Sequence, residues 1–134
     1  MFGRNRLMKE PREHDNGYLD AIRKLPCTVC GIWIGTEAAH IRMTSAEWEI
    51  KTGVRTGAGG GEKPHDRWAV PLCVSHHRTG NYAEHVIGTI AFWKRHELDP
   101  HAIADALYRA YPNEKKMWGV IMRVRVGLIG RVIT

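Results

Sequence analysis

Four residues of the kinds that bind zinc occur in two pairs with the same spacing. The pairs are C-x-x-C at Cys27 and Cys30 and C-x-x-H at Cys73 and His76. Zinc prefers four tetrahedral thiolate and imidazole ligands, and two intervening residues let one tight turn present two of them. The pattern predicts one structural Zn²⁺ bound by all four residues. His77 is the alternative to His76 as the histidine ligand, because the two are adjacent.

The cysteine count favours a metal site over disulfides. The chain has three cysteines, which cannot all pair within it. Residues 1–15 are polar and charged and lack the apolar stretch of a secretory signal, and no apolar run reaches the roughly 18–20 residues that span a bilayer. We therefore expect a cytoplasmic protein that does not enter a membrane and uses its cysteines to bind metal.

The charge balance predicts a polyanionic partner. The formal net charge is +6 and the pI is about 9.5, and residues 112–134 hold five Lys or Arg against one Glu. A basic protein binds nucleic acid through counterion release. Within this segment Lys115, Lys116, Arg123 and Arg125 are the candidates for contacts with DNA phosphates, with a merely solvated face as the alternative.

The hydrophobic periodicity and the positions of glycine and proline predict the helices and strands that hold these residues. A helix is expected over 17–25, a strand over 32–41 carrying His40, a loop over 52–66 and a second strand over 67–73. Thr44 and Glu47 have capping-box spacing for a short helix. Asp99 and Pro100 supply an N-cap and a first-turn proline for a helix over 101–111. Alternation over 123–128 suggests a final strand.

The order of these segments resembles the zinc-containing HNH (His-Me finger) endonucleases of phage and prophage origin. The segments that carry the resemblance are PCTVCG, EAAHIR, GEKPHDRWAVPLCVSHH and EHVIGTIAFW, within residues 25–96. The resemblance implies an α+β fold with a ββα-metal core, a structural zinc and flanking helices. We accordingly expect a nuclease domain at 16–111, between a basic arm (1–15) and a basic C-terminal extension (112–134). It also implies cleavage of DNA in the cytoplasm of a bacterial or phage-infected cell.

The resemblance also assigns roles. His40 matches the general base that activates water, and His77 and His85 match the ligands of a catalytic divalent ion, Mg²⁺ or Mn²⁺. Asp66 is expected either to orient the base or to ligate that ion. The chain departs from the family at two positions, because Ala39 stands where many members have a metal-binding Asp and Trp68 stands near the position of an Asn.

Spacing alone constrains the pair His77 and His85. They lie eight residues apart, which on one continuous helix is a rise of roughly 12 Å, too far for one ion. If both bind the same cation, the helix must break around Thr79–Asn81, with a new helix over Tyr82–His96 that buries Ile87, Ile90 and Trp93. An unbroken helix would leave only His77 as a ligand.

Two other functions are compatible with the same residues. A catalytically silent zinc-stapled module that binds DNA or a protein partner is the alternative that Ala39 favours. An RNA-binding zinc knuckle is disfavoured, because the long stretch 31–72 separates the two ligand pairs. Among the remaining residues, we expect His65, His96 and His101 at the surface. We expect the core to contain Trp33, Trp48, Trp68 and Trp93.

Overall fold

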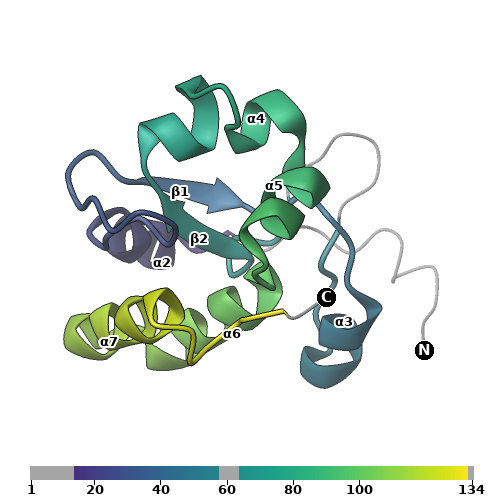
Figure 1. Ribbon diagram of the computed structural model, residues 1–134. Helices are drawn as coiled ribbons and strands as arrows, with labels where there is room; N and C mark the ends of the chain where they lie inside the picture. The colour runs from purple at the N-terminus through teal and green to yellow at the C-terminus, as the bar shows by residue number, and fades with distance from the viewer. Residues whose placement is uncertain (1–13, 58–63, 133–134) are drawn as a thin grey trace.

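Two short antiparallel strands lie at the centre of the fold. The computed structural model describes residues 14–57 and 64–132, and in it β1 (Glu37–His40) pairs with β2 (Ala69–Leu72) (Figure 1). The register joins Glu37 to Leu72 and His40 to Ala69. The helical elements in chain order are α2 (Asn16–Arg23), α3 (Ala46–Thr52), the π-helix η1 (Ser75–Thr79), α4 (Glu84–Ile87), α5 (Thr89–His96), α6 (Pro100–Ala110) and α7 (Glu114–Arg125). The expected α+β class is confirmed.

Helices cover the small sheet from both sides. In Figure 1, α4 lies above the strands, α5 lies to their right, α2 lies at their lower left, and α6 and α7 lie below them. Helix α2 packs against both strands, α6 packs against β2, and α7 packs on α6. Strand β2 is buried along its whole length. The sheet is therefore an internal support from which residues on either side of it are positioned.

Helix capping follows the sequence with one shift of register. The Asp99 carboxylate accepts hydrogen bonds from the backbone N–H groups of His101 and Ala102, and Pro100 begins α6 as predicted. For α3 the N-cap is Ser45, whose hydroxyl accepts from the Trp48 N–H. The expected Thr44–Glu47 capping box is wrong by one residue.

The C-terminal segment is a helix and not a strand. Helix α7 is capped by the Asn113 side chain, which accepts from the Lys116 N–H. The buried side chains recur three to four residues apart, which matches the helical period of 3.6 and outweighs the short alternation that suggested a strand. These buried residues are Met117, Val120, Ile121 and Val124. The predicted basic extension therefore contributes to the same core as the rest of the chain.

The burial of several tryptophan and histidine side chains differs from the prediction. Trp68 and Trp93 are fully buried, but Trp33 is 62% exposed because the strand expected over 32–41 begins only at Glu37. His65 and His101, expected at the surface, are buried. Burial lowers the pKa of His101, so that its ring is held in the neutral form.

Candidate metal centres

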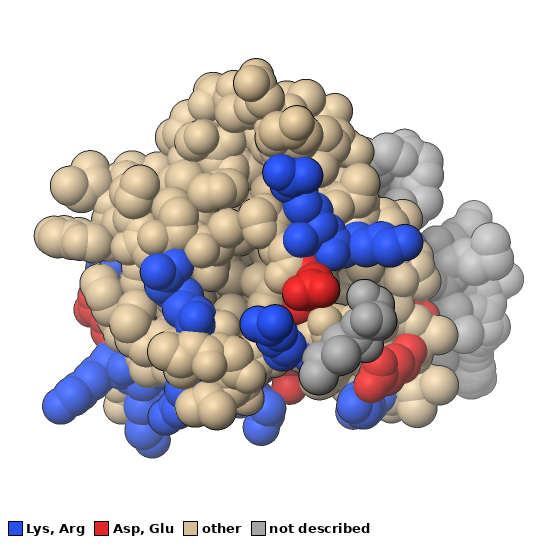
Figure 2. All heavy atoms as spheres, viewed as in Figure 1, with Lys and Arg blue, Asp and Glu red and all other residues tan. Residues whose placement is uncertain are grey.

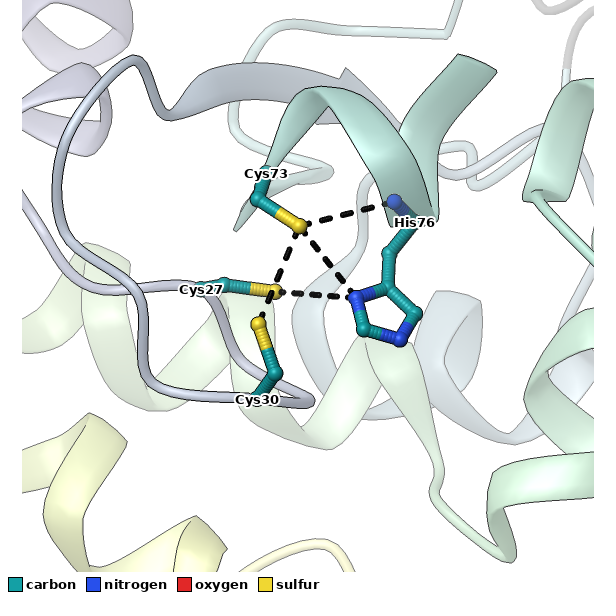
Figure 3. Close-up of side chains that lie close together, drawn as sticks. All are labelled: Cys27, Cys30, Cys73 and His76. Atoms are coloured by element: carbon teal, nitrogen blue, oxygen red, sulfur yellow. Dashed lines mark hydrogen bonds between the residues drawn. The ribbon is translucent and has the colours of Figure 1, made fainter. Parts of the chain in front are cut away.

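The four predicted zinc ligands converge on one point. Cys27 and Cys30 flank a turn that closes with a 2.9 Å hydrogen bond from the Gly31 N–H to the Cys27 carbonyl. Cys73 directly follows β2, and His76 lies in the π-helix after it. The candidate ligand atoms all lie within 4.8 Å of one another (Figure 3). We call these four residues the Cys₃His group.

The distances within the Cys₃His group suit a tetrahedral ion. The Cys30 and Cys73 sulfurs are 3.7 Å apart, and the His76 Nδ1 lies 3.2 Å from the Cys73 sulfur and 3.9 Å from the Cys27 sulfur. Zinc–sulfur bonds of about 2.3 Å in tetrahedral geometry separate two sulfurs by about 3.8 Å. The residues present therefore fit zinc, and the group could bind a metal such as Zn²⁺.

Burial shifts the pKa values of two members of this group, Cys27 and His76. It raises the pKa of the Cys27 thiol to about 11, against the lowering effect of nearby backbone N–H groups. It also lowers the pKa of His76. Metal binding requires thiolates, so a cation that enters the group displaces protons which the buried site otherwise retains.

The two adjacent histidines enter different groups. His77 turns away from the cysteines, and its Nδ1 lies 2.7 Å from the Glu37 carboxylate. Its Nε2 lies 3.8 Å from a carboxylate oxygen of Glu84, and its ring centroid is 4.5 Å from that of His85. Ligand atoms of His77, Glu84 and His85 lie within 4.8 Å of one another. We call these three residues the His₂Glu group.

A break in the chain brings His77 and His85 together. The π-helix ends at Thr79, and Gly80 is extended, with φ −74° and ψ 162°. A Cβ on Gly80 would lie 2.7 Å from the Ser75 carbonyl oxygen, so glycine is needed there for close backbone approach. The predicted break at Thr79–Asn81 is confirmed.

The helix after the break is shorter than predicted. It begins at Glu84 and ends at Ile87, where Gly88 with φ 95° separates it from α5. The resulting change of direction leaves Ile90 66% exposed, so its expected burial is wrong, whereas Trp93 is buried. The four-residue helix α4 therefore carries both Glu84 and His85.

Sequence reasoning missed Glu84. This residue is buried, and its Oε2 has no hydrogen-bond partner among the described residues. Burial raises the pKa of the Glu84 carboxyl, whereas the charge of His77 acts to lower it. A buried carboxylate with an unsatisfied oxygen is costly unless a cation or donor meets it. The available signal was its position next to His85.

Glu37 was the second residue missed. Its two carboxylate oxygens accept from Arg78 at 2.9 and 2.8 Å, and one of them also contacts His77. The Arg78 guanidinium holds the pKa of the Glu37 carboxyl at about 2, against a smaller effect of burial. Glu37 lies two residues before Ala39, on the same face of β1, since side chains alternate along a strand. Glu37 therefore places a carboxylate on the same face of β1 as Ala39, which has none.

The predicted base and its partner form a separate pair. His40 Nε2 lies 2.9 Å from a carboxylate oxygen of Asp66, whose other oxygen accepts from the Asp15 N–H at 2.8 Å. Asp66 therefore contacts the base candidate and is not a member of the His₂Glu group. Trp68, near the family's Asn position, is buried, and its indole N–H donates to the Arg55 carbonyl.

The basic residues of α7 do not form a single stripe. All four predicted phosphate contacts are exposed. At 100° per residue, Lys116 and Arg123 share one side of the helix, whereas Lys115 and Arg125 lie on others. Arg125 is occupied in part, because its Nη1 donates to the Val29 carbonyl at 2.9 Å. Figure 2 shows Lys and Arg side chains over α5 as well as over α6 and α7.

The comparisons with known proteins identify no relative. No family model matches the chain, and no curated protein or solved structure is significantly similar to it. Within residues 14–57 and 64–132, no helix is both long and apolar enough to cross a membrane. Any function must therefore be argued from the two ligand groups and the His40–Asp66 pair.

Proposed function

We propose that the protein is a metal-dependent HNH-type endonuclease that hydrolyses DNA phosphodiester bonds. The observation that carries the proposal is that His76 and His77, adjacent in sequence, enter two different ligand groups. One group has the four ligands of a structural zinc site, and the other has three, which leaves a coordination position for water or substrate, as in catalytic sites. In this proposal β1, β2 and the helical segment after β2 form a ββα-metal core.

The His40–Asp66 pair supports a base in this proposal. The contact of Nε2 with the Asp66 carboxylate favours the tautomer that donates from Nε2. In this proposal the ring, held by Asp66, acts as the base that receives the proton of the attacking water. Asp66 is fixed by the Asp15 N–H, so it positions the ring and stabilises the charge that the ring gains.

The His₂Glu group supports binding of a divalent ion. Two imidazoles and one carboxylate suit Mn²⁺, Ni²⁺ or Zn²⁺ better than Mg²⁺, which prefers oxygen ligands. A bound ion would supply positive charge to the phosphate and to the leaving oxygen. Glu37 accepts from His77 and thereby fixes the orientation of this ligand.

A plasmid-nicking assay tests the proposal. Zinc-loaded protein with Mn²⁺ or Mg²⁺ should convert supercoiled DNA to the nicked or linear form, and His40→Ala should reduce the rate at least about 10²-fold. His14→Ala, which removes an exposed imidazole, is the matched control. Circular dichroism and zinc content verify that both variants fold.

Two outcomes would contradict the proposal. Equal nicking by wild type and His40→Ala would remove His40 as the base. No nicking by folded, metal-loaded wild type would favour the silent zinc-stapled module that binds DNA or a protein partner.

A further inference from the structure

Three large apolar side chains project from the molecule between the C-x-x-C turn and β1. Ile32, Trp33 and Ile34 are 55%, 62% and 76% exposed. Their loop lies at the left margin of Figure 1, and in Figure 2 this margin consists of uncharged atoms that stand out from the body. We call these three consecutive exposed residues the ridge.

The base of this loop is held in place. The Cys27 N–H donates to the Ile32 carbonyl at 2.7 Å, and Gly31 donates back to the Cys27 carbonyl at 2.9 Å. Gly31 and Gly35, at the two ends of the ridge, have φ values of +81° and +72°, which glycine adopts without strain. Cys27 also belongs to the Cys₃His group. An apolar projection fixed in this way loses little conformational freedom on binding.

The charges beside the ridge favour an anionic partner. The Arg125 guanidinium lies against Gly31, since a Cβ built there would be 2.9 Å from its central carbon. Glu37, the acid that follows the loop, is paired with Arg78. The whole chain carries a formal charge of +6. Duplex DNA offers both an anionic backbone and an apolar interior of stacked bases, and proteins that bend it insert apolar side chains between base steps.

The loop is also close to the His₂Glu group along the chain. Ile34 precedes Glu37 by three residues, and the Glu37 carboxylate lies 2.7 Å from His77. An extended chain spans at most about 3.5 Å per residue, so the two Cα atoms are no more than about 11 Å apart. Stacked bases rise about 3.4 Å per step. The distance from Ile34 to Glu37 thus corresponds to about three base-pair steps, and Glu37 in turn contacts His77.

We propose that Ile32, Trp33 and Ile34 form a wedge that inserts between base steps of duplex DNA and unstacks them beside the cleavage site. The wedge rests on the proposed function, because it assumes that duplex DNA is the substrate. Unstacking opens the duplex toward the protein and lets more of the basic surface reach the backbone. Trp33 supplies a ring on which a displaced base can stack.

The test compares substitutions on and off the ridge. Zinc-loaded wild type, Trp33→Ser and Ile34→Ser are titrated onto a labelled duplex containing 2-aminopurine, without added divalent metal so that the DNA stays intact. Ile50→Ser is the matched control, because Ile50 is 84% exposed on α3, which lies across the molecule from the ridge (Figure 1). Fluorescence polarisation reports affinity, and 2-aminopurine emission rises when bases unstack.

Wild type and Ile50→Ser should bind alike and raise the emission. Trp33→Ser should bind about ten-fold more weakly or worse and abolish the rise, with zinc content and melting temperature unchanged. If Trp33→Ser matched wild type in affinity and emission, the wedge would be overturned. It would also be overturned if the only effect of Trp33→Ser were to dissociate a dimer, as measured by sedimentation. If Trp33→Ser still cleaves DNA and binds it with unchanged affinity, the wedge is rejected and the proposed nuclease is not. If the wild type unstacks bases but never cleaves, the proposed nuclease is rejected and the wedge is not.

Discussion

The two ligand groups lie side by side but connect the chain in opposite ways. The Cys₃His group joins a turn before β1 to the segment after β2, and its two ligand pairs are separated by 43 positions between Cys30 and Cys73. The His₂Glu group lies entirely within residues 77–85. A metal in the first group closes a long loop, whereas a metal in the second closes only a short one. Loss of the first ion should therefore affect folding, and loss of the second should affect only what that ion does.

The two ligand groups also differ in the exposure of their side chains. Cys27 and Cys73 are buried and Cys30 and His76 half-buried, whereas His85 is exposed. A closed four-ligand group holds its ion and excludes substrate, but a three-ligand group with an exposed edge can exchange its ion and admit a phosphate. The contrast teaches that neighbouring residues of one short segment, His76 and His77, can belong to two candidate ligand groups of different exposure.

The largest expected effect comes from breaking the Cys₃His group. Cys73→Ser should abolish tight zinc binding and cooperative unfolding, because structural zinc contributes on the order of 10 kcal/mol to folding in small zinc domains. Elemental analysis should find about one zinc per wild-type chain, and thermal unfolding by circular dichroism should lose its transition in the variant. Asn81→Ala, at an exposed position between His77 and His85, is the control, because it leaves all four ligands of the Cys₃His group in place. Zinc-free protein that unfolds like wild type would defeat the comparison.

Glu84→Gln should separate metal binding from stability. Burial raises the pKa of the Glu84 carboxyl. At pH values above the ordinary pKa of a glutamate, its ionisation therefore lowers the free energy of unfolding. The amide variant cannot ionise and lacks this cost. We expect unchanged or higher melting temperature without added metal, together with Mn²⁺ affinity reduced by at least about 10²-fold. Calorimetric titration of zinc-loaded protein measures the affinity. An unaltered dissociation constant would exclude Glu84 as a ligand.

Glu37→Gln should have a smaller effect on the same ion. Glu37 accepts from His77 Nδ1 at 2.7 Å, and removal of such supporting carboxylates lowers metal affinity about 10- to 100-fold. Arg78→Gln is the matched control, because it removes the other partner of Glu37 and leaves the contact with His77. Both variants should retain full zinc content. Because the two substitutions change the charge near the ion in opposite directions, loss of Mn²⁺ affinity in Glu37→Gln but not in Arg78→Gln is expected. Unchanged affinity in Glu37→Gln would exclude Glu37 as a support for His77.

The sequence predicted the Cys₃His group because its spacing is a local property. Two-residue spacing and a compatible pair elsewhere are readable without knowing the fold. The break at Gly80 was also predictable, because a helical rise is incompatible with one ion shared by His77 and His85. Both arguments depend on geometry along the chain and not on how distant segments pack.

What could not be predicted depends on tertiary contacts. The contact of Glu37 with His77 follows from where η1 packs against the sheet, which no local pattern encodes. The same is true of His101, whose burial follows from packing against Trp68 at a ring separation of 5.2 Å. Helix α7 was misread because three alternating residues near Arg123 and Arg125 outweighed the longer helical period that its packing on α6 requires.

The smallest expected effect concerns the surface that serves neither group. Because α7 buries Met117 and Ile121, deletion of 112–134 would unfold the protein and could not test DNA binding. Lys116→Gln and Arg123→Gln instead remove charge from one exposed side of the helix. Each should weaken binding a few-fold for every sequence and reduce the slope of log K against log salt by about 1.

Lys115→Gln, on a different side of α7, is the control for total charge. A reduced slope in all three variants would mean that net charge acts at a distance. A change confined to Lys116 and Arg123 would identify the side of α7 that meets the backbone, with zinc and Mn²⁺ binding untouched.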